Sequence, residues 1–145
     1  MRLPNFPIYM KKIRRWAKAG QINIRKKKYL ACEGIYYPHK RTIAYCSTLS
    51  ESEVITCLLH ELGHLMDDYA WDGKYSHKFL VDGLDNLEKS KLPTKRQKEK
   101  IIGIERGAWR YAEGLAKILK IPLGKWYYKD KKKAFDTYLK IKTRD

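Results

Sequence analysis

The chain has 145 residues, of which 43% are hydrophobic, and its 32 Lys and Arg residues outnumber 16 Asp and Glu residues to give a net charge of +16. This length suits one domain, residues 1–145, whose core needs no disulfides. It contains no apolar run of about 18 residues and no apolar signal stretch near its start, so we expect neither a membrane span nor a secretory signal. Cys32, Cys46 and Cys57 include no C-x-x-C pair, which favours reduced thiols and a cytoplasmic location.

The first half of the chain predicts one helix and then about three short strands. Apolar residues recur at helical spacing over residues 8–19, and Gly20 is suited to end that helix. Alternating or β-rich stretches follow at Ile22–Ile24, Tyr29–Tyr37 and Ile43–Tyr45. We expect these strands to form a small antiparallel or mixed sheet.

The second half predicts helices. Ser50 and Glu53 have the spacing of a capping box, and the apolar stripe behind them indicates a half-buried helix over residues 51–69. Residues 70–95 show little periodicity. A second long helix is expected over residues 97–120, ended by Pro122, and a short helix around residues 134–139. The fold class is therefore α+β.

The motif His60-Glu61-Leu62-Gly63-His64 lies within the first of these long helices. Histidines four residues apart share one helix face, so their ring nitrogens can meet at one metal ion, and zinc is the metal typical of this pattern. Glu61 is rotated by about 100° from His60, close enough to accept a proton from water at the metal. The competing interpretation is a pair of surface histidines on an ordinary amphipathic helix.

A catalytic zinc site needs a third protein ligand. Glu105 is our first candidate, because Ala108, Ala112 and Ala116 would let its helix pack closely against the motif helix. His77, 13 residues after His64, is the alternative.

Two further side chains near the motif have open roles. Asp67 follows His64 by three residues and either orients a ligand histidine or faces solvent. Cys57 precedes His60 by three residues and either approaches the metal or, as we favour, fills the core.

The order of strands, motif helix and Glu-bearing helix resembles the gluzincin zinc metallopeptidases, and E-x-x-A-W-x-Y-A after the motif is similar to small bacterial and phage-type proteins of that kind. The resemblance covers roughly residues 40–120. It implies a zincin-like fold, Zn²⁺ held by His60, His64 and Glu105, and hydrolysis of a peptide or protein substrate with Glu61 as general base. We expect the substrate to pair with an edge strand around Thr42–Cys46.

The spacing of His77 instead resembles the SprT-like DNA-associated proteases, whose third ligand is a histidine. Lys78 stands where those proteins usually have glycine.

Basic residues cluster along the chain, and the basic C-terminal segment, residues 123–145, also carries aromatic side chains. Such a composition predicts attraction to polyanions and could indicate a nucleic-acid surface, although we favour solvated helix faces whose aromatic side chains belong to the core. Two alternatives to a free-standing peptidase therefore remain. One is a nucleic-acid-associated protease, and the other is a basic binding protein whose zinc is structural or absent.

Overall fold

The computed structural model describes residues 1–28, 34–70 and 92–144. In this part the chain forms α1 (Phe6–Ala19), β1 (Asn23–Lys27), β2 (Gly34–Tyr37), a 3₁₀ turn (Pro38–Lys40), β3 (Thr42–Cys46), α2 (Glu51–Ala70), α4 (Lys95–Leu119) and α5 (Lys125–Leu139). The expected α+β class and order of elements are confirmed for these residues. His77 and most of the stretch 70–95 lie outside the described residues.

The three strands form one mixed sheet in the order β1-β3-β2. β2 pairs with β3 in antiparallel register, with Ile35 opposite Ala44, whereas β1 pairs with β3 in parallel, with Ile24 opposite Ile43. The expectation that Thr42–Cys46 is an edge strand is wrong. β1 occupies the side of β3 that β2 leaves open, so β3 becomes the central strand and its Ile43, Ala44 and Tyr45 are buried.

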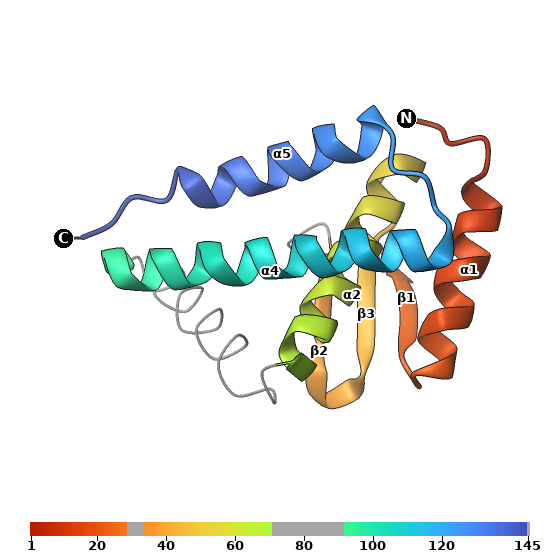
Figure 1. Cartoon of the computed structure of the whole chain (residues 1–145), viewed down its shortest axis with the longest axis horizontal. Helices are drawn as coiled ribbons and strands as arrows, with labels where there is room; N and C mark the ends of the chain where they lie inside the picture. Colours follow the sequence, from red (N-terminus) through yellow and green to blue (C-terminus); the bar gives the residue numbers. More distant parts are fainter. Residues whose placement is uncertain (29–33, 71–91, 145) are drawn as a thin grey trace.

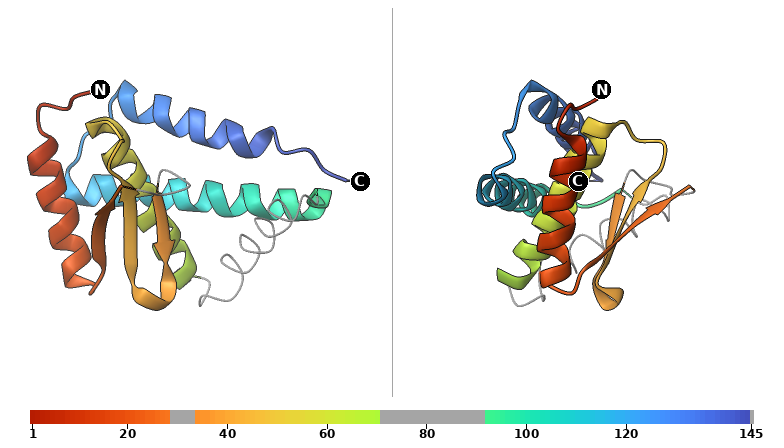
Figure 2. Two further views of the ribbon diagram at one scale, coloured as in Figure 1. Left: turned by 180° about the vertical axis from the view of Figure 1, so that it is seen from behind. Right: turned by 90° about the vertical axis from the view of Figure 1, so that its right-hand side faces the viewer.

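The helices are stacked on one side of this sheet (Figures 1 and 2). α1 and α2 lie next to the strands, and α4 crosses α2 on the side away from the sheet. α5 runs back beside α4 and also contacts α2. The core fills the space between the sheet, α2 and α4, where Leu58, Leu59 and Leu62 are fully buried.

Local signals determine where the two long helices begin. The Ser50 Oγ accepts a bond from the Glu53 amide at 3.4 Å, and the Ser50 amide donates to the Glu53 carboxylate at 3.1 Å, which confirms the expected capping box of α2. α4 begins with a second capping box, between Thr94 and Gln97.

The last helix is longer than the expected short segment around 134–139. α5 begins at Lys125, directly after Gly124, because its first turn also has a core contact: Tyr127 is fully buried. The Tyr127 hydroxyl donates to the Glu113 carboxylate of α4 at 2.9 Å, and Lys131 contacts the same carboxylate at 2.7 Å. Burial, and then the Glu113 charge, raise the pKa of Tyr127 above its ordinary value, so this hydroxyl stays a donor at physiological pH.

Among the described helices, none combines the length and apolar character needed to cross a membrane.

Candidate metal centre

α2 holds both histidines of the motif on one face. Their Nε2 atoms lie 3.1 Å apart, as expected for side chains separated by one helical turn. Each side chain is only 13% exposed. The interpretation of the pair as ordinary surface histidines is therefore wrong, because surface imidazoles would point into water rather than toward one another.

α4 brings Glu105 to these two nitrogens. One carboxylate oxygen lies 3.0 Å from His60 Nε2 and the other lies 3.1 Å from His64 Nε2. The approach depends on small residues: a side chain on Gly63 would collide with the Ala108 carbonyl, so α2 and α4 touch backbone to backbone there. The close packing expected from the alanines of α4 is thus present, and Glu105 itself is 1% exposed.

Polar atoms at this cluster lack other partners. Within the described part of the chain, neither oxygen of Glu105 receives a bond from a well-oriented N–H or O–H, and His60 Nδ1 is also without a partner. Burying such atoms unpaired costs about 1–3 kcal/mol each. These three side chains could hold a metal ion.

The donor set fits zinc. One ligand atom each from His60, His64 and Glu105 lies within 4.8 Å of the others. Neighbouring ligands of a tetrahedral zinc ion are about 3.3 Å apart, close to the separations of 3.0 and 3.1 Å found here. Imidazole nitrogen and carboxylate oxygen are both ordinary zinc ligands.

Contacts within this cluster also shift the pKa values of His64 and Glu105. Burial acts to lower the pKa of His64, but contact with the Glu105 carboxylate and the nearby charges of Glu61 and Asp67 outweigh it and raise that pKa to about 8. Burial acts to raise the pKa of Glu105, and the two imidazoles outweigh it and hold that pKa well below its usual range. Glu105 is therefore an anion at neutral pH, the form that binds metal.

Asp67 is 5% exposed, so the expectation that it faces solvent is wrong. Its carboxylate lies against the backbone of Gly107 on α4, where an added methyl group would sit 3.0 Å from both oxygens. Its charge contributes to the raised pKa of His64. A direct orienting role toward a ligand histidine stays a prediction.

Cys57 is 8% exposed and packs against β2. A side chain on Gly34 would overlap the Cys57 sulfur. The sulfur is outside the group of ligand atoms formed by His60, His64 and Glu105. The expected core role therefore describes it better than a ligand role.

Trp109 also belongs to the site; in the sequence it stands in the stretch E-x-x-A-W-x-Y-A, where no role was expected for it. Its indole stacks on the His60 ring with centroids 4.0 Å apart and an interplanar angle of 26°. It is 3% exposed, and its Nε1 has no hydrogen-bond partner among the described residues. The available signal was its position four residues after Glu105, which puts both side chains on one face of α4.

A groove of about 580 Å³ opens beside the cluster. Its walls come from α2, α4, α5 and the start of β2, and His60, Glu61 and Trp109 line it. Asp130 of α5 lines it too, and burial raises the pKa of that carboxyl despite a 3.3 Å bond from Thr56. Glu61 thus lines an open groove next to His60, a candidate metal ligand.

No protein-family model, curated protein sequence or solved structure matches this chain. The assignment of the site therefore rests on its own geometry and chemistry.

Proposed function

We propose that this protein is a zinc-dependent peptidase whose metal is held by His60, His64 and Glu105. The observation that carries the proposal is the convergence of two imidazole nitrogens and one buried carboxylate at 3.0–3.1 Å, with Glu61 beside them in the same groove. The motif resembles that of the gluzincin metallopeptidases, and a glutamate ligand on a second helix agrees with that resemblance. His77 remains the alternative third ligand.

Bound zinc would supply a Lewis acid that activates water and polarises a peptide carbonyl. Glu61 would take the proton of the attacking water and then pass it to the leaving amine, acting first as base and then as acid. Its place in the groove gives it access to both. Glu105 would stay ionised throughout, because the pKa of its carboxyl is held low.

The substrate would lie along the groove and pair with β2 rather than with Thr42–Cys46. Within the described sheet β2 has a strand on one side only, and its Gly34 lies against Cys57 and Glu61 of α2. An extended peptide added to this edge would pass next to Glu61, held by backbone hydrogen bonds. Backbone hydrogen bonds do not depend on which side chains the peptide carries. Selectivity between peptide substrates would therefore come from the α5 residues that line the groove.

Zinc content and peptide hydrolysis, measured on the same preparations, test the proposal. We expect wild type to hold one zinc and to cleave fluorescently labelled casein. Glu61→Gln should keep the zinc but lose at least about 100-fold in activity, because it removes the proton acceptor and no ligand. Glu105→Gln should lose the zinc as well as the activity.

Glu99→Gln is the matched control, since Glu99 is an exposed carboxylate on the same helix, and it should change neither quantity. His77→Ala distinguishes the two candidate ligands. Zinc lost in His77→Ala and retained in Glu105→Gln would contradict our ligand assignment. Full activity in Glu61→Gln would contradict the peptidase mechanism.

A further inference from the structure

The start of the chain has a charge distribution that the candidate active site does not use. Residues 1–28 contain ten Lys and Arg residues and no Asp or Glu. These residues form α1 and β1, and they lie outside the groove beside His60. Positive charges on neighbouring elements repel one another and lower the stability of the fold. A function that uses these charges would explain why they are there.

α1 arranges its cations around a buried stripe. Tyr9, Met10, Ile13 and Ala17 face the core. At 100° per residue, Lys11, Arg15 and Lys18 fall on the opposite side of the helix, and all three are exposed. They form a ridge that spans two turns of α1 and points entirely into solvent.

Further cations lie on β1, where successive side chains point to opposite faces of the sheet. Arg14, beside the ridge, donates to the Ile24 carbonyl of β1 at 3.3 Å and so ties the two elements together. Arg25, Lys26, Lys27 and Lys28 follow and are all exposed. The right-hand view of Figure 2 looks onto this end of the molecule, with α1 in front and β1 running obliquely away from its lower end. We call Lys11, Arg14, Arg15, Lys18 and Arg25–Lys28 the α1–β1 face.

Acidic side chains do not neutralise this face. Among the described residues, Lys131 pairs with Glu113 and Lys132 with Asp136, and both pairs lie on α4 and α5. α5 therefore carries partly compensated charge, with Asp130 and Asp136 among its lysines. The α1–β1 face carries eight cations and no anion of its own.

We propose that the α1–β1 face binds the phosphate backbone of nucleic acid without regard to base sequence. Phosphates follow one another along a strand at regular short intervals, which suits cations placed along a helix ridge and an adjoining strand. A lipid surface fits less well. Ile8 is the one large hydrophobic side chain of α1 that is exposed, and the others lie in the core or pack against it, which leaves little to insert among lipids.

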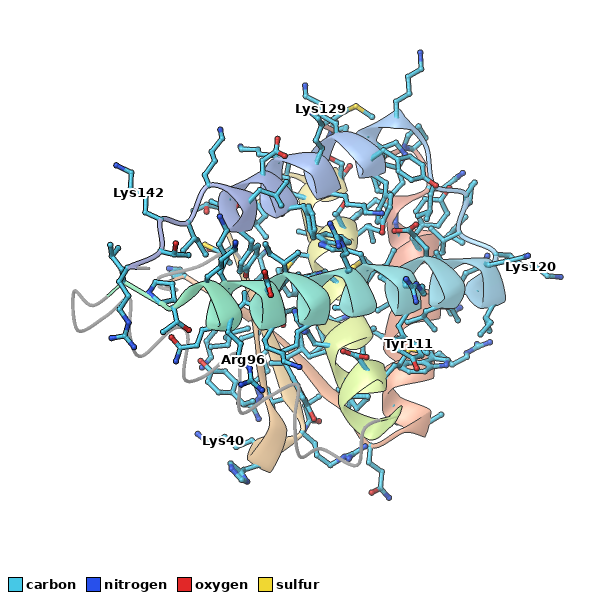
Figure 3. The ribbon with its side chains drawn as sticks, turned by 60° about the vertical axis from the view of Figure 1, so that its left-hand side comes forward. Lys40, Arg96, Tyr111, Lys120, Lys129 and Lys142 are labelled. Carbon is cyan, nitrogen blue, oxygen red and sulfur yellow. The ribbon has the colours of Figure 1, made fainter. Side chains whose placement is uncertain are left out.

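The test compares two triple variants of the full chain that have the same net charge. Lys11→Gln/Arg15→Gln/Lys18→Gln removes the ridge, and Lys129→Gln/Lys140→Gln/Lys142→Gln removes three exposed lysines of α5 and the tail after it. Figure 3 shows Lys129 and Lys142 pointing away from the body of the molecule on that side. Glutamine has nearly the helix propensity of lysine and arginine, so both variants should fold.

Binding is measured by fluorescence anisotropy with a short labelled DNA duplex of mixed sequence, between about 50 and 200 mM salt. The ridge variant should bind about tenfold more weakly or worse, and the slope of log K against log salt should become shallower by about 2–3, because three phosphate contacts are lost. In the control variant, the loss of affinity and the change in the salt slope should each be less than half of those in the ridge variant.

Three results would overturn the proposal. Equal losses in the two variants would show that net charge alone attracts the duplex. No binding by wild type at the lowest salt would show that the face is only a solvated surface. A ridge variant that keeps duplex binding but no longer binds vesicles of anionic phospholipid would assign the face to a membrane. None of these results depends on whether Glu61 is catalytic.

Discussion

Trp109 restricts the motion of His60 from the side that the metal would not occupy. Its ring covers the imidazole at a centroid distance of 4.0 Å, and it is itself held against Tyr127 of α5. A neighbour that fixes a ligand ring favours metal binding by reducing the freedom that the ring loses.

We therefore expect Trp109→Leu, which removes the stacked ring, to weaken zinc binding by about tenfold or more. Trp109→Phe keeps an aromatic ring and removes the unpartnered N–H, so it should weaken binding less. Competition with a chromophoric chelator measures both affinities. Trp126→Leu makes the same kind of change on α5, outside the groove lining, and should leave the affinity unchanged. Equal affinities of Trp109→Leu and wild type would exclude a positioning role.

Single residues of the site differ in how far the sequence could predict them. Spacing alone placed His60, Glu61 and His64 together, because four residues make about one turn of any helix. Glu105 needed a tertiary argument, and the small residues Ala108 and Ala112 provided it. The position of Trp109 four residues after Glu105 was a signal, but its contact with His60 was not predictable, since an aromatic residue at a helical core position has the same pattern whether it packs on leucine or on a candidate ligand.

At the scale of elements, the site depends on how closely α2 and α4 cross. Gly63 contacts the backbone of α4 directly: an added methyl group would overlap the Ala108 carbonyl oxygen and lie 3.2 Å from the Ala112 nitrogen. Glycine in a helix costs about 1 kcal/mol relative to alanine, and here it permits the contact that brings Glu105 to the histidines.

Gly63→Ala should therefore lower the free energy of unfolding by about 1–3 kcal/mol, because forcing the helices apart outweighs the gain in helix propensity. Gly114→Ala is the control. Gly114 lies on α4 with nothing within 4 Å of an added methyl group, so this change should stabilise by about 0.5–1 kcal/mol. Urea denaturation measures both. A Gly63→Ala protein as stable as Gly114→Ala would show that the two helices have room to adjust.

The elements themselves were largely predictable, and their pairing was not. Capping residues and apolar periodicity are local, so α1, α2 and α4 begin and end close to their predicted limits. The parallel pairing of β1 with β3 joins segments that are not adjacent in the sequence, and no pattern within the strands indicates it. For that reason the edge strand next to the motif was misassigned, and it is β2 that borders Glu61.

For the whole molecule, the net charge of +16 affects stability as well as partners. Like charges on a compact chain repel one another, and salt screens them over about 10 Å at 0.1 M. Composition predicts this repulsion, and the sequence already gathers ten Lys and Arg residues in residues 1–28, which form α1 and β1.

We expect the melting temperature to rise by about 2–4 °C between low salt and 0.15 M sodium chloride, the equivalent of about 1 kcal/mol. Differential scanning calorimetry measures the shift. The Lys11→Gln/Arg15→Gln/Lys18→Gln variant should show a smaller rise, because part of the repulsion is already gone. A melting temperature that falls with added salt would mean that favourable charge pairs outweigh the repulsion.

The candidate ligand groups come from two helices, and His64 and Glu105 are 41 positions apart in the chain. An ion shared between them would clasp α2 to α4, so the helices could not separate without giving up a ligand. Catalytic activity and the stability of the fold would then both depend on the same bound ion. A molecule that lost its ion would stop turning over substrate and, in the same event, would begin to open at its centre.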